Sequence, residues 1–367
     1  MGGELQLRTH TVGDGRPVFI VAECGINHDG SLDQALRMIE AAANVGADGV
    51  KFQLFRAAGM YTPRAGMYRT ATDGLVPIYE LMEDVQLPLE WIPSLSRAAR
   101  DHGVEFIMTV CDEWCVAAMD EFEFDVYKVS SYEIGHLPML AEIARRDKPV
   151  FLSTGAATME DVQEAVQTVS PHGQRPFGLF QCTAKYPAPE EELDLAVIGT
   201  FARTYPQAVV GFSDHSFDPV RAPVQSVYHG AKMIEKHFTL DRNLPGVDHS
   251  FAVEPGHLRA LIAAVREAEA RMAARQPLAV DPTLAGRDTK VVEPHEQTLR
   301  DFATRGIFAV ESIAAGEAFS GENLRVLRPG ELPQGLHPRY LAELLAGGIA
   351  ARDIPQWTGL QWEDVRR

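Results

Sequence analysis

Short apolar runs, rich in β-branched residues, recur along the first 270 residues, and most of them end in polar residues. The segments between most of them have the length of one amphipathic helix; in the first such segment, apolar residues from Leu32 to Ala42 recur at helical spacing. Thr158 and Asp161 at the start of another, and Ser31 and Gln34 at the start of the first, have the spacing of helix capping boxes. The apolar runs begin at Phe19, Gly49, Glu105, Asp125, Pro149, Phe177, Ala208 and Met233.

Eight alternations of strand and helix predict a parallel (β/α)8 barrel, an α/β fold. A doubly wound open sheet is the main alternative, and the absence of a glycine-rich dinucleotide loop after the first strand disfavours it. The composition changes at "ARQPLAVDPTLAGRD", which is typical of a linker, and the chain beyond it is short, punctuated by glycine and predicted to be mostly β. We therefore expect a barrel domain over residues 1–273, a linker over 274–297 and a small domain over 298–367.

Polar side chains gather where the predicted strands end. In a barrel of this kind the catalytic groups lie at the C-terminal ends of the strands, whereas buried strands otherwise prefer apolar residues. Burying so many polar groups is costly unless they meet one another or a ligand, so we expect a single polar site. Its candidates are Glu23, Asn27, Lys51, Gln53, Thr109, Lys128, Ser131, Glu133, Ser153, Thr183, Ser213, Asp214, His215 and His237.

The residue types in this set indicate its chemistry. Lysines and serine hydroxyls suit a phosphate or a carboxylate. His215 and His237 end neighbouring predicted strands, where two imidazoles can share one divalent cation whose shell is completed by water. Glu23, on the first strand, can close the ring beside the eighth. Taken singly, a lysine in a strand is more often exposed and a histidine more often a hydrogen-bonded core residue, so the argument rests on their joint placement.

Composition narrows the class of protein. Hydrophobic residues make up 46% and charged residues 23% of the 367-residue chain, as in ordinary globular proteins. No secretory signal or long apolar segment occurs, and four cysteines are too few for a disulfide scaffold, so we expect a cytoplasmic protein with no membrane partner. The net charge of -17 disfavours nucleic acid as a partner. Cys111 and Cys115 lack the further ligands that a zinc site needs.

Several long sequence words, in order, resemble those of the sialic acid synthase family. They are "AECGINHDG", "GADGVKFQ", "STGAATMEDV", "CTAKYPAP", "GFSDHS" and "EKHFTLDRNLPGVDHSFAVEP", and "ATRGIFAVESIAAGEAFSGENLRVLRPG" is similar to the small antifreeze-like (SAF) domain that ends these enzymes. The resemblance covers nearly the whole chain. It implies a (β/α)8 (TIM) barrel followed by a SAF domain.

The resemblance implies a C–C bond-forming transferase that condenses phosphoenolpyruvate with an aldehyde sugar, N-acetylmannosamine or a related amino sugar, to give a nonulosonic α-keto acid and phosphate. It implies a divalent metal on His215 and His237, manganese first and magnesium or cobalt next, and a catalytic set of these histidines with Glu23 and Lys51. The implied phosphoenolpyruvate-binding residues are Lys51, Lys128, Ser131, Ser153 and Ser213. The implied sugar and cavity residues are Gln53, Thr109, Glu133, Tyr186, Asp248 and Arg305.

The resemblance also implies a homodimer with exchanged domains, in which the small domain of one chain caps the barrel of the other. Arg305 is then the arginine that reaches the partner's sugar site. Two departures from the family pattern bear on the substrate. Ala184 stands where the family has a Ser or Asn that can donate to the phosphate, and Lys185 is the candidate to replace that donor. Tyr132 stands where sialic acid synthases proper carry Gly; an aromatic residue at this place resembles the relatives that make pseudaminic acid.

Three alternatives stay open at this point. One is a related synthase with a different aldehyde acceptor, acting in polysaccharide or natural-product biosynthesis. A second is a non-catalytic sugar-binding protein on the same fold, which would be expected to lose the histidine pair or the lysines. The third is an aldolase that forms a Schiff base, which needs a lysine desolvated in an apolar pocket.

Overall fold

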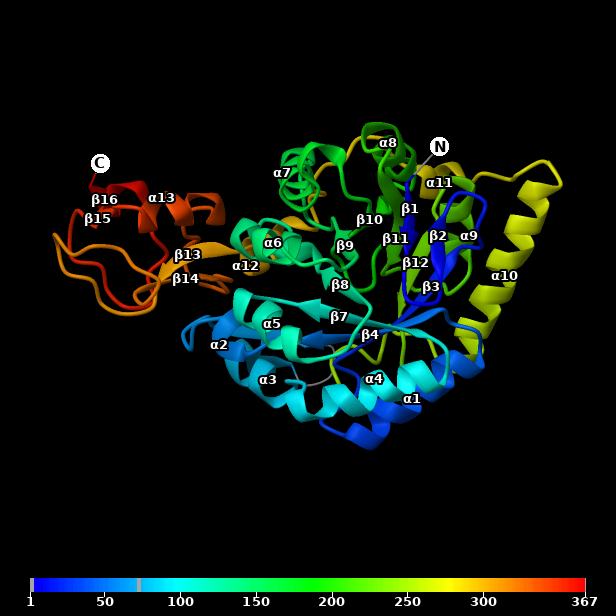
Figure 1. Ribbon diagram of the computed structural model, residues 1–367, viewed down its shortest axis with the longest axis horizontal. Coiled ribbons are helices and arrows are strands. Elements are labelled where there is room, and N and C mark those ends of the chain that lie inside the picture. Colours follow the sequence, from blue (N-terminus) through cyan, green and yellow to red (C-terminus); the bar gives the residue numbers. More distant parts are fainter. Residues whose placement is uncertain (1–2, 71–73, 367) are drawn as a thin grey trace.

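The computed structural model describes residues 3–70 and 74–366 (Figure 1). Eight parallel strands close into a barrel in the order β10-β11-β12-β3-β4-β7-β8-β9, so each strand pairs with its neighbours in the sequence of barrel strands. All eight strands predicted from the apolar runs form, and the predicted barrel is confirmed. The barrel strands are β3 (Phe19–Gly25), β4 (Gly49–Leu54), β7 (Glu105–Val110), β8 (Val126–Val129), β9 (Val150–Ser153), β10 (Phe177–Cys182), β11 (Ala208–Asp214) and β12 (Met233–His237).

Helices surround the barrel because each presents one apolar stripe to the outer face of the strands. The main core lies between these helices and the barrel strands. A second apolar cluster, including Phe19, Phe151 and Phe180, fills the interior of the barrel toward the N-terminal ends of the strands. The helices of this part of the chain are α1 (Leu32–Asn44), α2 (Ala57–Met60), α3 (Ile78–Asp84), α4 (Ile92–Asp101), α5 (Glu113–Ala118), α6 (Leu137–Ala144), α7 (Met159–Val169), α8 (Ala196–Thr204), α9 (Arg221–Tyr228) and α10 (Pro255–Ala273).

Of the two capping boxes predicted from the sequence, the one at α7 forms and the one at α1 forms only in part. Thr158 and Asp161 form the reciprocal capping box at the start of α7 that the sequence predicts. At α1 the hydroxyl of Ser31 accepts the N–H of Gln34 at 3.2 Å, but the Gln34 amide donates instead to Asn27 O at 2.7 Å. The capping box predicted there is therefore wrong in its second half, because the amide of Gln34 fixes the loop after β3 instead.

An antiparallel hairpin, β1 (Glu4–Gln6) and β2 (Thr11–Gly13), lies at the N-terminal end of the barrel and was not predicted. Its turn places Thr9 and His10 against Glu105, the buried first residue of β7. One oxygen of Glu105 accepts hydrogen bonds from the Thr9 N–H at 2.8 Å, the Thr9 hydroxyl at 2.7 Å and the His10 Nδ1 at 2.9 Å. Burial alone would raise the pKa of Glu105, but these hydrogen bonds outweigh it and lower the pKa to about 2.

We expect Glu105 to stabilise the fold above the pKa of an unfolded glutamate, about 4.3. Because the folded-state pKa is lower, this contribution should be lost as the pH falls from about 4.3 toward 2. Glu105→Gln should lower the urea midpoint at pH 7 and flatten its dependence on pH in that window. The control, Glu322→Gln, changes an exposed carboxylate. A Glu105→Gln protein with the wild-type midpoint at both pH 7 and pH 4 would contradict this role.

The C-terminal domain lies at one end of the barrel, beside α6, and α12 leads into it (Figure 1). It has its own core, which includes Ile307, Phe319 and Leu344. No described helix has both the length and the apolar character of a membrane span. A second hairpin, β5 (Met67–Arg69) and β6 (Leu75–Pro77), follows β4. The remaining α-helices and strands are α11 (Pro282–Ala285), α12 (Gln297–Ala303), β13 (Gly306–Ala309), β14 (Leu324–Leu327), α13 (Leu341–Leu345), β15 (Ile349–Ala350) and β16 (Val365–Arg366).

Candidate active site

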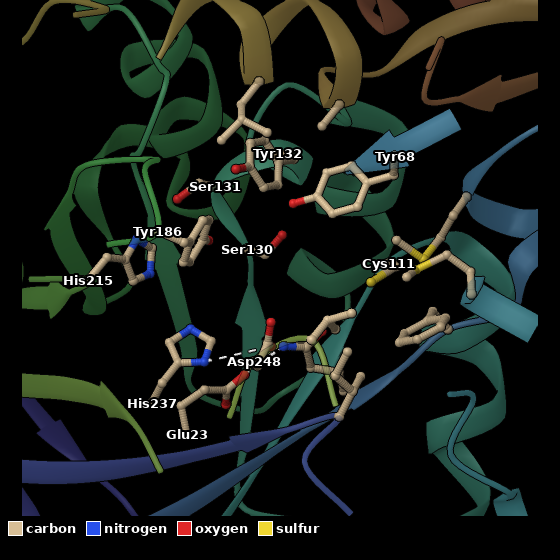
Figure 2. Close-up of a pocket in the computed structure, with 18 of the residues that line it drawn as sticks. Glu23, Tyr68, Cys111, Ser130, Ser131, Tyr132, Tyr186, His215, His237 and Asp248 are labelled. Carbon is tan, nitrogen blue, oxygen red and sulfur yellow. Dashed lines mark hydrogen bonds and ion pairs between the residues drawn. The ribbon is translucent and has the colours of Figure 1, made fainter. Parts of the chain in front are cut away.

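A cavity of about 450 Å³ opens at the C-terminal ends of the barrel strands and extends to α12 and β14. Figure 2 shows Glu23, His215 and His237 on one side of it and Tyr68 and Tyr132 toward the other. Most of the residues that the sequence predicts for the site come together in its wall, as strand-end positions of one barrel must. They are Glu23, Lys51, Gln53, Lys128, Ser131, Ser153, Tyr186, Ser213, His215, His237 and Asp248.

Six predicted residues are absent from the described lining: Asn27, Thr109, Glu133, Thr183, Asp214 and Arg305. Asn27 donates to Phe238 O at 3.0 Å, and Asp214 binds the Lys236 ammonium group at 2.6 Å, so both hold the backbone around the site. Thr109 accepts a hydrogen bond from the Lys51 ammonium group at 3.1 Å, so it supports a lining residue. Glu133 and Arg305 are fully buried and bind each other. A direct sugar contact by Glu133 or Arg305 would require this arrangement to open.

Two lysines and two carboxylates form a buried network at the floor of the cavity. The Lys51 ammonium group lies 2.7 Å from Glu23 Oε2 and 3.7 Å from Glu235, and the Lys128 ammonium group lies 2.7 Å from Glu235. Gln53 donates to the other oxygen of Glu23 at 2.6 Å. Glu235 was missed in the sequence, although it lies two residues before His237 on one strand and alternation places both on the same face.

The charges in this network determine what it can bind. Burial would lower the pKa of Lys51, but Glu23 and Glu235 outweigh it and raise the pKa, so this lysine stays a cation. Burial raises the pKa of Glu23 in spite of Lys51, whereas the two lysines lower that of Glu235 to about 2 against the effect of burial. Burial also lowers the pKa of Lys128. The floor of the cavity can therefore hold an anion between two lysines and carries a carboxylate, Glu23, suited to accept a proton.

His215 and His237 face the same space, with ring centroids 5.4 Å apart, and Tyr186 packs on the His215 ring at 4.2 Å. The Nδ1 of His215 lies 2.8 Å from the carbonyl oxygen of Thr183. A carbonyl only accepts, so this nitrogen carries the proton and Nε2 is left to bind a metal or another donor. Burial lowers the pKa of His237 well below its usual value, which keeps that imidazole neutral as a metal ligand must be.

Among the described residues, no three His, Cys, Asp or Glu side chains are grouped so as to hold a metal ion. Two imidazoles that face one cavity fit a cation whose other ligands are water and substrate, the arrangement of catalytic rather than structural sites. Asp248 lies beside this pair, with Oδ2 3.7 Å from the Nδ1 of His237, and burial raises its pKa to about 7.

The C-terminal domain contributes an arginine that the sequence analysis missed. Arg328, directly after β14, lines the cavity, and its guanidinium binds Glu133 at 2.5 Å and lies 5.2 Å from the ring of Tyr132. Arg305, predicted to face the sugar, instead donates to Cys111 O at 2.5 Å and Gly59 O at 2.6 Å. Both arginines contact the barrel of their own chain, whereas the prediction assigns this contact to a partner.

Neither departure at the "CTAKYP" word supplies a new donor to the cavity. Ala184 is fully buried, and its N–H donates to Glu296 at 2.6 Å. Lys185 is exposed and is absent from the described lining. The outer part of the cavity is mostly apolar and aromatic, with Met60, Tyr61, Tyr68, Ile78, Leu81, Met82, Phe251 and Phe302 in its wall.

A closed parallel barrel with a polar cavity at its strand ends is the architecture of (β/α)8-barrel enzymes. Sequence comparison identifies the family within this class. The NeuB family model matches residues 38–276 and the SAF domain model matches residues 304–366. The chain belongs to the NeuB family, and both the resemblance to sialic acid synthases and the predicted SAF domain are confirmed.

Individual relatives match along nearly their whole length. The spore coat polysaccharide biosynthesis protein SpsE of Bacillus subtilis is 46% identical over 360 residues, 98% of this chain and 96% of that protein. Its crystal structure superposes with a TM-score of 0.89 at 45% identity, covering 100% of this chain and 99% of that one. The N,N'-diacetyllegionaminic acid synthase of Legionella pneumophila is 31% identical over 360 residues, 96% of each chain.

Proposed function

We propose that this protein condenses phosphoenolpyruvate with an aldehyde amino sugar to give a nonulosonic α-keto acid and phosphate. The observation that carries the proposal is the joint placement of two buried lysines, three serines and two imidazoles in one cavity. A non-catalytic sugar-binding protein would have no need of buried lysines held by carboxylates, whose burial is costly. Relatives named as synthases of legionaminic and pseudaminic acid support the same reaction.

The anionic substrate fits the floor of the cavity. Lys51 and Lys128 supply the positive charge and Ser131, Ser153 and Ser213 the hydroxyl donors for its phosphate and carboxylate. The hydroxyl oxygen of Ser153 is buried with no hydrogen-bond partner in the described part of the chain, so it is available to a ligand. When phosphoenolpyruvate binds, its negative charges take over contacts that Glu23 and Glu235 make with the lysines.

The reaction balances without an oxidant or a reductant. C3 of phosphoenolpyruvate bonds to the aldehyde carbon, whose C=O electron pair moves to oxygen, and that oxygen takes up a proton to become a hydroxyl. Water adds at C2 with loss of one proton. The C2–O bond to phosphate then breaks, and the new C2 hydroxyl gives its proton to the leaving phosphate and becomes the keto oxygen. Glu23, held by Lys51 and Gln53, accepts the proton of that water. A divalent metal held by His215 and His237, manganese first and magnesium or cobalt next, would polarise the aldehyde oxygen.

The acceptor binds toward the aromatic side of the cavity. Arg328 and Asp248 supply a cation and a carboxyl group for its polar groups, and Tyr68, Tyr132 and Tyr186 supply apolar faces. N-acetylmannosamine and related amino sugars fit this mixture. The similarity to a spore coat polysaccharide biosynthesis protein favours, as a second candidate, a different amino-sugar aldehyde used for a polysaccharide.

We propose further that the protein is a cytoplasmic homodimer in which the C-terminal domains cap the barrels of partner subunits. The four cysteines are buried thiols, as a reducing compartment favours. The contacts of Arg305 and Arg328 with Glu133 support a docked cap, and the same contacts can be made by the domain of either chain.

Phosphate release tests the reaction. With phosphoenolpyruvate and Mn²⁺, we expect release only when an amino-sugar aldehyde is added from a panel of acetylated and non-acetylated hexosamines. Borohydride with pyruvate should leave the mass of the protein unchanged, because the ammonium group of Lys128 is held by Glu235 for anion binding. A borohydride-stable adduct on Lys128 would favour the aldolase, and binding of the sugars with no phosphate release from any of them would favour a non-catalytic protein.

A further inference from the structure

The segment predicted to be a linker contains charged side chains that are buried in the barrel. Glu296 is 1% exposed and Lys290 is 5% exposed. A solvated linker would leave both in water, and burying a charge is costly unless it is well paired. Their burial therefore indicates a specific role where they pack against the loops that follow β9 and β10.

Both side chains bind the short segment that follows β10. The Lys290 ammonium group donates to Cys182 O at 3.0 Å, and the Glu296 Oε1 accepts the N–H of Ala184 at 2.6 Å. Between these two residues lies Thr183, whose carbonyl oxygen faces His215 Nδ1 at 2.8 Å. The linker thus hydrogen-bonds to the backbone on both sides of the Thr183 carbonyl, which accepts the hydrogen bond from His215 Nδ1.

The same carboxylate also ties in the next loop of the barrel. Glu296 Oε1 accepts the N–H of Ala156 at 2.8 Å, and its Oε2 accepts the N–H of Glu293 at 2.9 Å. Ala156 follows β9, which ends at Ser153 in the cavity wall. One buried side chain of the linker therefore joins the loops after β9 and β10 and closes its own turn.

We propose that Lys290 and Glu296 are positioning residues that hold the Thr183 carbonyl in place and so fix the Nδ1–H form of His215, with Nε2 free for the metal. This rests on the proposed function for the identity of the metal, but the orientation of the imidazole does not depend on it. Residues that orient a ligand through its other ring nitrogen usually change metal affinity when they are altered.

Glu296→Ala and Lys290→Met remove the two contacts, and Glu296→Gln keeps an oxygen that can accept both N–H groups. In protein labelled with ¹⁵N-histidine, freed of metal and held at a pH high enough to keep His215 neutral, long-range ¹⁵N–¹H correlation should show only the Nδ1–H tautomer of His215 for wild type and Glu296→Gln. The Ala and Met variants should show a mixture of tautomers. Their affinity for Mn²⁺, measured by calorimetry without substrate, should fall about tenfold, the lower end for such ligand-orienting residues.

Arg287→Met is the matched control, because Arg287 ties the same segment to Asp194 and Glu293 and does not touch residues 182–184. It should change neither the tautomer nor the affinity for Mn²⁺. A wild-type tautomer and affinity in both Glu296→Ala and Lys290→Met would overturn the proposal, even if thermal stability fell. If Glu296→Ala does not fold, Lys290→Met alone decides by the same readouts. If the wild-type protein binds no Mn²⁺, the proposed metal fails and the tautomer still tests the role of the linker.

Discussion

His215→Ala and His237→Ala should each reduce turnover with phosphoenolpyruvate and an amino-sugar aldehyde by at least about 10³-fold, the upper range for losing one electrostatic stabiliser of a transition state. The physical reason is that these two imidazoles, with ring centroids 5.4 Å apart, are the only pair of histidines in the described cavity wall. One imidazole with water cannot hold a divalent cation at low concentration. Steady-state phosphate release and Mn²⁺ calorimetry check both parts of the expectation.

Metal removal provides the matching experiment. Chelation should inactivate the wild-type protein, and added Mn²⁺ should restore it, whereas neither histidine variant should recover. His102→Ala is the control, since His102 is exposed at the end of α4. Circular dichroism and a thermal midpoint near that of the wild type would show that the barrel of each variant is folded. Full turnover by His215→Ala in metal-free buffer would exclude the two-imidazole site.

The barrel could be predicted from sequence because its strands repeat a local signal. Strands such as β3 and β11 are buried along their whole length and are mostly apolar, and polar side chains follow or end these runs at the cavity. The short hairpins β1–β2 and β5–β6 have no such signal. Strands of three residues are fixed by what they pack against, as Thr9 and His10 are by Glu105, and that partner lies about 95 residues away in the chain.

The alternation of β12 could have placed Glu235 in the predicted site, but the sequence analysis did not use it. Glu235 alternates with His237 on β12, so a strand reading that places one in the cavity places the other there too. Its role could not be inferred from that position alone. Only the closure of the barrel brings the Glu235 carboxylate on β12 between Lys51 on β4 and Lys128 on β8. No two of these three strands are neighbours in the barrel.

The choice between two arginines could not be made from sequence. Arg305 precedes β13 and Arg328 follows β14, and the antiparallel register pairs Gly306 with Leu327. Both arginines therefore stand at the same end of the hairpin and reach the same carboxylate, Glu133. Which of them faces the cavity depends on how the domain docks, which no periodicity in the chain encodes.

Arg328→Ala should raise the Michaelis constant of the sugar acceptor about 10- to 150-fold, as expected for loss of a hydrogen bond to a charged group worth about 1.5–3 kcal/mol. The Michaelis constant of phosphoenolpyruvate should change little, because the lysines that would bind it lie on the barrel floor. Arg305→Ala should act differently. It leaves Glu133 with one arginine and leaves three carbonyls, those of Gly59, Cys111 and Val326, without this donor, so we expect a loss of stability of about 3–5 kcal/mol.

The control lies on the same strand. Arg325 is exposed on β14, three residues from Arg328, and Arg325→Ala should leave both Michaelis constants unchanged. If Arg305→Ala raised the acceptor constant while Arg328→Ala left it unchanged, the original prediction for Arg305 would be right and the geometry of the docked domain would not represent the active state.

Mixed dimers decide which chain supplies the cap. One chain carries Arg328→Ala and an intact barrel, and the other carries Lys51→Ala and an intact C-terminal domain. If the domains are exchanged, each mixed dimer contains one site with a normal barrel and a normal cap, and the acceptor constant of that site should return to the wild-type value. If each cap serves its own barrel, every site keeps one defect. Chain exchange confirmed by mass, with activity no higher than in Arg328→Ala alone, would show that the cap acts within one chain.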